Sequence, residues 1–330
     1  MSSDSAGYAC GFTSHLLDDT TRARPVAADL WYPAAAGAVE AAHDYGLGTG
    51  RTAVDAAPAT GPFPVLVLSH GAFGAARNYA WLAEYLSRRG TVLCGVSHYR
   101  ESYLFGPRTI DPAAAMQVAD RAQDCSFALD HVLRESRLAG TVDAARIGAL
   151  GHSSGGATVA ALLGGVFEPP AMRAYCVSSP PGTDRGCGYG SAAPPGEGED
   201  REPSVRAADP RIRAGVLLDP ALGPGFQAES LAALTVPVHV VGSVENDFLP
   251  VEHHAARYAR LIPTAAYTPL DGGEGHFVYL NTCDTVREAN GVPLCRDRHG
   301  VDRDGVHRRL APLIADFFDA ALSHPAGSGG

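Results

Sequence analysis

Short apolar runs alternate with longer stretches of helical period along most of the chain after residue 60. The run at 64–69 (PVLVLS) is apolar at almost every position, as in a strand buried on both faces of a parallel sheet. We predict further strands at 25–31, 91–97, 146–150, 213–218, 236–241 and 265–269, and helices at 77–89, 111–138, 154–164 and 304–322. This alternation predicts an α/β fold, with a mostly parallel central sheet and helices on both faces.

Two segments interrupt the alternation. Residues 34–60 are rich in Ala, Gly and polar side chains and lack a period, so we expect a long surface loop there. Residues 169–210 are denser in Pro, Gly and charge, and so long a segment inside a compact domain is commonly a lid or an excursion. We therefore expect a single domain over 1–330 with a lid-like insertion at 169–210.

Composition narrows the classes of function. The 330 residues carry 26 basic and 36 acidic side chains, a formal net charge of −10, without a basic stripe to follow a phosphate backbone. A nucleic-acid partner is therefore not expected. Every basic residue is Arg and none is Lys, which excludes Schiff-base, pyridoxal-phosphate and P-loop chemistry that depends on a lysine. We expect a small-molecule substrate and no cofactor, and the sequence predicts no oligomeric state.

Membrane and leader signals are absent from the sequence pattern. The longest apolar run, 157–166, contains two glycines and is shorter than the roughly 18 residues of a membrane-spanning helix. Residues 1–11 lack the basic region followed by an apolar stretch that is typical of a signal peptide. We therefore expect a protein without a membrane span that is cytoplasmic, or secreted if a leader has been removed.

Six of the seven cysteines fall into two groups. Cys94 and Cys125 lie in patterns that read as buried strand and helix, where a lone cysteine is commonly a small apolar residue. Two further pairs flank loop-like stretches that a disulfide could constrain, namely Cys176 with Cys187 and Cys283 with Cys295. No Cys-x-x-Cys or Cys-plus-His spacing is present, so we expect no metal site.

The sequence 151–155 (GHSSG) matches the G-x-S-x-G motif. A predicted strand ends at Leu150 and a predicted helix starts at Ser154, which is the strand–turn–helix setting of a nucleophile elbow. Small flanking residues let the backbone fold back on itself, and the helix N-terminus directs amides at a reacting carbonyl. We predict Ser153 as the nucleophile; the alternative is a glycine-rich turn with a capping serine.

The sequence 69–74 (SHGAFG) directly follows the first core strand, where this architecture places the second half of an oxyanion hole. We expect the backbone amide of Ser154 to act together with that of Ala72 or Phe73. His70, in the same segment, is expected to stabilise the loop rather than to act as a base.

The general base is expected late in the chain, after the last strand. His276 lies there in a glycine-rich segment, 272–277 (GGEGHF). Its neutral imidazole would accept the serine proton, so activity is expected to rise with pH through the ordinary histidine range of about 6 to 7.

Three carboxylates qualify as the acid that orients the histidine. Asp247 follows a late strand within 242–250 (GSVENDFLP), which is the usual position, and we favour it. Asp219 ends the preceding strand in LLDP, a position that some hydrolases use, and Glu245 is a third, weaker choice. We expect the aspartate that is not the acid of the triad to anchor a loop. Replacing the true acid with asparagine is expected to lower turnover at least about a hundredfold more than the same substitution at the other aspartate.

The ordered set RPVAADLWYP, VLSHGAFG, GHSSGG, LLDPALGP, VENDFLP and GEGHFVYL, with the closing helix, resembles the α/β-hydrolase superfamily. The resemblance spans about 24–318 and is to predicted dienelactone hydrolases, a group similar to bacterial polyester hydrolases and platelet-activating-factor acetylhydrolases. The acetylhydrolases imply Asp219 as the acid and the polyester hydrolases imply Asp247. Dienelactone hydrolases proper use a cysteine nucleophile, and this chain departs from them with Ser153.

These features predict a serine hydrolase of carboxylic esters or lactones that works through an acyl-enzyme on Ser153. The same triad could act on an amide or a thioester, or transfer the acyl group to an alcohol as an acyltransferase or cyclase. A third hypothesis is a binding protein on an inactive hydrolase scaffold.

Overall fold

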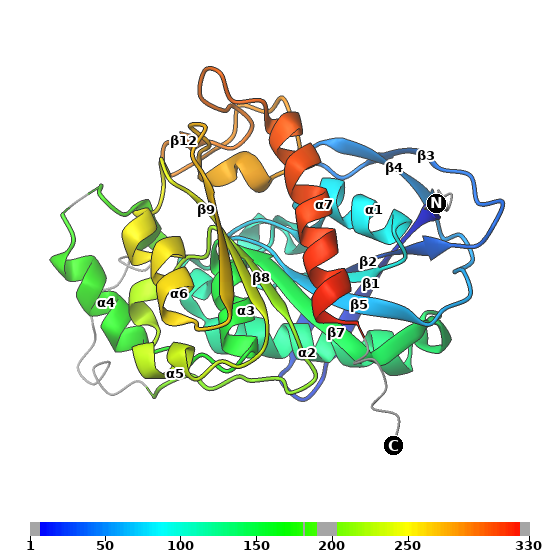
Figure 1. Ribbon diagram of the computed structural model, residues 1–330, viewed down its shortest axis with the longest axis horizontal. Helices are drawn as coiled ribbons and strands as arrows, with labels where there is room; N and C mark the ends of the chain where they lie inside the picture. Colours follow the sequence, from blue (N-terminus) through cyan, green and yellow to red (C-terminus); the bar gives the residue numbers. More distant parts are fainter. Residues whose placement is uncertain (1–6, 181, 190–202, 324–330) are drawn as a thin grey trace.

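The computed structural model describes residues 7–180, 182–189 and 203–323 (Figure 1). Within them, ten strands form one sheet in the order β10-β9-β8-β7-β5-β6-β2-β1-β4-β3. The strands are β1 (Ala9–Asp19), β2 (Arg24–Ala34), β3 (Ala41–Asp44), β4 (Thr49–Val54), β5 (Phe63–Ser69), β6 (Val92–Ser97), β7 (Val142–His152), β8 (Gly215–Leu218), β9 (Val238–Ser243) and β10 (Ala265–Leu270). A two-stranded hairpin, β11 (Glu288–Ala289) and β12 (Val292–Pro293), lies outside that sheet.

The six strands from β5 to β10 run parallel to their neighbours, so their carboxyl ends lie along one edge of the sheet. Strand β2 joins β6 antiparallel, and β1 joins β2 antiparallel over eleven residue pairs. The predicted mostly parallel α/β sheet is therefore confirmed. The loops that follow β5, β7, β8 and β9 are brought together at the shared edge.

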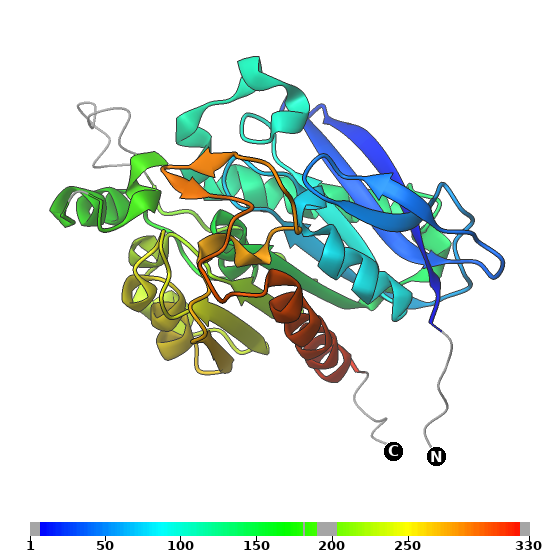
Figure 2. The same cartoon turned by 90° about the horizontal axis from the view of Figure 1, so that it is seen from above.

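Helices cover both faces of the sheet (Figures 1 and 2). They are α1 (Ala80–Arg88), α2 (Val118–Arg134), α3 (Ser154–Leu162), α4 (Pro169–Ser178), α5 (Ala228–Ala232), α6 (Ala255–Leu261) and α7 (Arg303–Ala321). Helices α1 and α7 bury apolar side chains in a core cluster on one face. Helices α2, α3 and α6 contribute to a second cluster on the other face. Helix α4 lies at the opposite end of the molecule from β3 and β4 in both views.

Some of the predicted boundaries are wrong. The long helix predicted at 111–138 is a 3-10 turn, Pro112–Met116, followed by α2, because Gln117 between them takes φ −79° and ψ 66°, outside the helical range. The surface loop predicted at 34–60 contains the hairpin β3–β4, and β1 lies in a segment for which no strand was predicted. These strands lack a strong apolar alternation, and pairing with neighbours fixes them.

The lid-like insertion predicted at 169–210 contains α4 and a 3-10 turn, Arg185–Tyr189. Residues 181 and 190–202 of this segment lie outside the described residues, and its role as a lid stays a prediction. Among the described residues, no helix combines the length and the apolar character needed to cross a membrane.

The cysteine predictions are confirmed. Disulfides join Cys176 to Cys187 and Cys283 to Cys295. Cys94 on β6 and Cys125 on α2 are buried free thiols, as is Cys10.

Candidate active site

Ser153 lies at the sharp turn between β7 and α3. Its backbone takes φ 55° and ψ −121°, a conformation that residues other than glycine rarely adopt. The residue is 8% exposed. The flanking glycines are required by space: a Cβ on Gly155 would lie 1.9 Å from the carbonyl oxygen of Ser69, and one on Gly151 would lie 2.2 Å from that of Gly155. The predicted strand–turn–helix setting of Ser153 is therefore present.

The loop after β5 faces this turn. Gly71, Ala72 and Phe73 line the same cavity as Ser153, and Phe73 takes a positive φ of 58°. Ser154 is the first residue of α3, where the backbone N–H groups lack intrahelical acceptors and carry the positive end of the helix dipole. The structure thus brings together the two segments from which the oxyanion donors were predicted.

His276 begins a short 3-10 turn, His276–Tyr279, and is 1% exposed. It lines the cavity together with Ser153, and within the described residues its Nε2 has no hydrogen-bond partner. Its ring stacks on Phe248 with ring centroids 5.1 Å apart. A buried imidazole nitrogen without a partner, on the wall of the cavity that holds Ser153, is available to accept a proton.

Among the described residues, Asp219, which follows β8 directly, has the carboxylate nearest the ring nitrogens of His276. Its Oδ2 lies 3.6 Å from Nδ1 of His276, and both side chains are 1% exposed. Its Oδ1 accepts a hydrogen bond from the Ser243 backbone N–H at 2.7 Å. Asn246 donates to Oδ2 of Asp219 at 3.0 Å, and the same Nδ2 lies 3.4 Å from Nδ1 of the histidine. Asp219 is thereby held in one orientation beside the imidazole.

Asp247, which the sequence favoured, contacts a different part of His276. Its Oδ1 accepts from the backbone N–H of His276 at 2.9 Å, and its side chain is 27% exposed. A Cβ on Gly275 would lie 2.6 Å from the Asp247 carboxylate, so this close approach requires glycine. Asp247 therefore anchors the backbone of the loop that carries the base.

Glu245 points away from the imidazole. Its side chain is 65% exposed and pairs with Arg298 at 3.6 Å.

Burial changes the pKa values of His276 and Asp219 in opposite directions. It lowers the pKa of His276, because a charged imidazolium loses its hydration, and it raises the pKa of Asp219 for the same reason. Hydrogen bonds from Ser243 and Asn246 oppose the rise at Asp219. His276 is accordingly neutral at pH 7, the form that a general base needs.

His152 and Tyr79 connect the three loops of the site. The Gly71 N–H donates to the Tyr79 hydroxyl at 3.1 Å, and this hydroxyl donates to Nδ1 of His152 at 2.9 Å. The other ring nitrogen, Nε2, donates to the carbonyl of His276 at 2.9 Å. Burial lowers the pKa of His152 to about 3, so the ring is neutral and has one donor and one acceptor.

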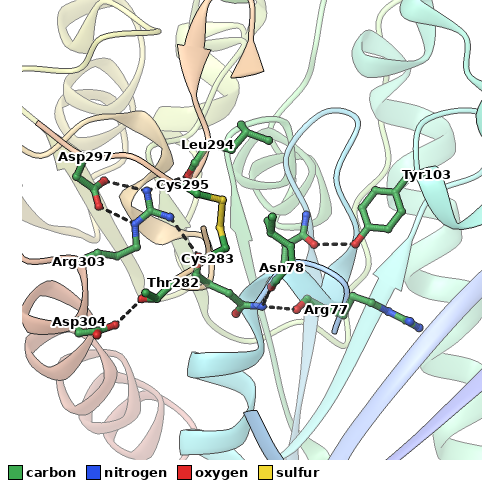
Figure 3. Close-up of a disulfide and its surroundings, with 12 residues drawn as sticks. Arg77, Asn78, Tyr103, Thr282, Cys283, Leu294, Cys295, Asp297, Arg303 and Asp304 are labelled. Carbon is green, nitrogen blue, oxygen red and sulfur yellow. Dashed lines mark hydrogen bonds and ion pairs between the residues drawn. A yellow bond between two sulfur atoms is a disulfide. The ribbon is translucent and has the colours of Figure 1, made fainter. Parts of the chain in front are cut away.

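The cavity beside Ser153 has a volume of about 470 Å³, within the usual range of small-molecule sites. Four aromatic rings in contact line it: Phe73 with Tyr189 at 4.9 Å, Tyr189 with Phe248 at 5.9 Å, and Phe248 with Phe277 at 5.2 Å between centroids. The segment between Cys283 and Cys295 contributes further lining residues, Arg287 to Asn290 and Leu294. Figure 3 shows how Arg303 holds this segment, donating to the carbonyl of Leu294 and pairing with Asp297 at 2.9 Å.

Sequence reasoning missed Asn246 and Tyr79. Asn246 lies next to Asp247 within a segment already identified, but an amide gives no catalytic signal of its own. Tyr79 lies in the 3-10 turn before α1, where an aromatic residue is expected to be core. No group of three or more His, Cys, Asp and Glu side chains that could hold a metal occurs among the described residues.

Comparisons with known proteins agree with this architecture. No protein-family model matches the chain. Over 221 residues, 65% of this chain, it is 23% identical to Cutinase 1 of Thermobifida cellulosilytica and, likewise at 23%, to a cutinase of Thermobifida fusca. The match spans 61% and 53% of those relatives.

Among solved structures, a ferulic acid esterase from Streptomyces cinnamoneus superposes with a TM-score of 0.63 at 21% identity. The superposition covers 99% of this chain and 96% of that one. The resemblance to the narrower dienelactone hydrolase group stays a prediction. The chain adopts the α/β-hydrolase fold.

Proposed function

We propose that this protein is a serine hydrolase of carboxylic esters, with Ser153 as nucleophile, His276 as general base and Asp219 as the acid of the triad. One observation carries the proposal above all: Ser153, in its strained turn, and Nε2 of His276, which has no hydrogen-bond partner in the described part of the chain, face the same cavity. The names of the similar proteins, two cutinases and a ferulic acid esterase, also favour ester hydrolysis.

In the first half of the reaction, Ser153 Oγ attacks the ester carbonyl carbon while its proton passes to Nε2 of His276. The carbonyl oxygen becomes an oxyanion. We propose that it accepts hydrogen bonds from the amide of Ser154 and from that of Ala72 or Phe73, since these segments lie on either side of Ser153. The imidazolium then gives its proton to the leaving alkoxide as the carbon–oxygen bond breaks, which leaves an acyl-enzyme and a free alcohol.

In the second half, water takes the place of the alcohol. His276 accepts a proton from the water as its oxygen attacks the acyl carbon, and it returns the proton to Ser153 Oγ when the carboxylic acid is released. Asp219 stays ionised while the imidazolium exists. It accepts a hydrogen bond from the Nδ1–H group, which fixes the tautomer in which Nε2 is free to accept the serine proton. Its separation from Nδ1 is 3.6 Å, and we expect it to shorten when that charge forms.

We assign the acid to Asp219 rather than to Asp247 because the two carboxylates meet different groups of the histidine. A ring nitrogen transmits orientation to the imidazole, whereas the backbone N–H that Asp247 binds fixes the loop. The aromatic rings that line the cavity favour an apolar or aromatic acyl or alcohol group, since such rings recognise flat apolar surfaces.

A fluorophosphonate probe tests the proposal. We expect the purified protein to be labelled once, and Ser153→Ala to be folded, unlabelled and inactive on short aryl esters. A panel of matched ester, thioester and amide substrates then separates the acyl groups that the triad could act on, and we expect the ester to be hydrolysed fastest. Labelling of Ser153→Ala, or its retention of more than a few per cent of the activity, would refute the assignment.

A further inference from the structure

Arg121, on α2, is fully buried beneath the candidate site. Its guanidinium donates to four acceptors that lie on three separate parts of the chain: Thr158 Oγ1, Glu101 Oε2, and, from adjacent residues, Ser69 Oγ and the carbonyl oxygen of His70. Arg121 is not among the residues that line the cavity, so it does not meet a substrate there. Two of its contacts nevertheless lead to the two segments proposed to supply the oxyanion donors.

The first contact leads to α3. Nε of Arg121 donates to Oγ1 of Thr158 at 2.9 Å, and the Thr158 hydroxyl donates to the carbonyl of Ser154 at 2.9 Å. That carbonyl belongs to the peptide group next to the Ser154 amide. Arg121 is thus connected through one side chain to the first turn of the helix that presents one proposed donor.

The second contact leads to the loop after β5. One terminal nitrogen of Arg121 donates to the carbonyl of His70, and it also lies 3.2 Å from Ser69 Oγ. The peptide group of that carbonyl directly precedes Gly71 and Ala72. Arg121 therefore holds the backbone of the loop that presents the other proposed donor.

A buried hydrogen-bond chain fixes the loop from its other side. Ser69 Oγ accepts from Arg121, so its own proton is donated to Nε2 of His98, 2.9 Å away. Nδ1 of His98 then donates to Asp124 at 3.0 Å. The backbone N–H of His98 also donates to Nε2 of His70 at 3.1 Å. These hydrogen bonds hold the side chains of Ser69 and His70 in place, and with them the backbone that carries the His70 carbonyl.

Glu101 compensates the charge of Arg121, and both side chains are at most 1% exposed. A buried ion pair contributes little net stability, because desolvation offsets most of the attraction. What the planar guanidinium supplies is geometry: its rigid fork of donors holds several acceptors at fixed relative positions. A lysine, with one nitrogen, could not reach the Thr158 hydroxyl and the His70 carbonyl with the same geometry.

We propose that Arg121 is a positioning residue that fixes the spacing between the two halves of the oxyanion hole. This inference rests on the proposed ester hydrolysis at Ser153. Misplacing one donor lowers the stability of the transition state more than that of the bound substrate, since charge on the oxygen develops only in the transition state. The expected signature is a loss in kcat with little change in KM.

Three variants test the proposal. Arg121→Lys keeps the positive charge but loses the planar set of guanidinium donors. Thr158→Val removes the hydroxyl that connects Arg121 to α3, with almost no change in side-chain shape. The double variant Arg121→Gln/Glu101→Gln avoids leaving a buried unpaired carboxylate and keeps the test open if Arg121→Lys does not fold. Val132→Ala, a buried position on the same helix, is the matched control for a general loss of stability.

Fluorophosphonate titration counts reactive sites, so that kcat is expressed per labelled Ser153. We expect Arg121→Lys and Thr158→Val to lower kcat about 10- to 100-fold, with KM within about threefold. The inhibition constant of a trifluoromethyl ketone, which forms a tetrahedral adduct, is expected to rise in step with the fall in kcat/KM. Val132→Ala is expected to lower Tm and to leave kcat per site within about twofold.

The proposal is overturned if folded Arg121→Lys, Thr158→Val and the double variant keep kcat per site within about twofold of the unsubstituted protein. It is also overturned if Val132→Ala loses as much kcat as they do. Failure of the proposed ester hydrolysis would show separately, because the unsubstituted protein would then neither take the probe nor hydrolyse any ester, and both proposals would fall.

Discussion

Oδ2 of Asp219 lies 3.6 Å from Nδ1 of His276, whereas Asp247 accepts from the backbone N–H of the same histidine at 2.9 Å. The two aspartates follow neighbouring parallel strands, β8 and β9, and both reach one residue. One lies beside the ring and the other holds the loop. Their different contacts predict different consequences of substitution.

We predict that Asp219→Asn lowers kcat by about 10⁴, because the imidazole loses the carboxylate that fixes its tautomer and stabilises its charge. Asp247→Asn is expected to be at least about a hundredfold more active, since an amide oxygen can still accept from the His276 backbone. This order is the reverse of the one predicted from the sequence. Steady-state kinetics on an aryl ester provide the measurement, and circular dichroism shows whether each variant is folded.

Glu245→Gln is the matched control for that pair, because its side chain is 65% exposed and faces Arg298. Its kcat is expected to stay within about twofold. A slower Asp247→Asn than Asp219→Asn would move the acid to Asp247.

The second prediction concerns the pH dependence of kcat/KM. His276 must be neutral to accept a proton, and burial lowers its pKa below the ordinary 6.5, so the neutral form persists to lower pH. We therefore expect the midpoint of the acidic limb of the kcat/KM profile to lie below 6.5, the ordinary value for a histidine. A profile on a neutral aryl ester from pH 4 to pH 9 tests this. A limb with its midpoint at or above 6.5 would contradict it.

The third prediction concerns the elbow. In Gly155→Ala the new Cβ would lie 1.9 Å from the carbonyl oxygen of Ser69 and 2.8 Å from that of His70, so α3 or the loop after β5 must shift. We expect a loss of at least about 1–3 kcal/mol in the free energy of unfolding, together with loss of activity. Urea denaturation measures the first quantity.

Gly140→Ala is the control for this substitution, because a Cβ there meets no atom within 4 Å. It is expected to change the free energy of unfolding by no more than about 0.5 kcal/mol. Equal stability of the two variants would mean that the packing around Gly155 is looser than the structure indicates.

The fourth prediction concerns the disulfides. With both formed, the denatured, unreduced protein should expose three thiols, those of Cys10, Cys94 and Cys125, and seven after reduction. Cys283→Ala/Cys295→Ala opens a loop of 12 residues, which is expected to lower the free energy of unfolding by about 2–4 kcal/mol. It should also raise KM for an aryl ester, because the released segment lines the cavity. Seven thiols without reduction would contradict the pairing.

Strands with a strong pattern of their own were predicted well. The apolar run at 64–69 is β5, Phe63–Ser69, and the other predicted parallel strands all have counterparts in the sheet. Strand β1 was not predicted, although it pairs with β2 over its full length. Residues 14–18 are half-buried or exposed, with an irregular apolar pattern, whereas Cys10 and Phe12 are buried, so pairing with β2 and burial of these two side chains together hold the strand.

Local sequence patterns were enough to predict the α/β class, the strand–turn–helix around Ser153, the loop at 69–74 and the glycine-rich segment of His276, because each depends on local backbone requirements. Only the folded chain shows which carboxylate meets the imidazole and that Arg121 lies beneath both donor segments. These depend on side-chain directions at the edge of a sheet, where Asp219 takes a φ of 37° and Asn246 contacts both the carboxylate and the ring. Residues 27 to 57 positions apart in the chain meet there only after the strands have paired. A local sequence pattern therefore cannot show that they are in contact.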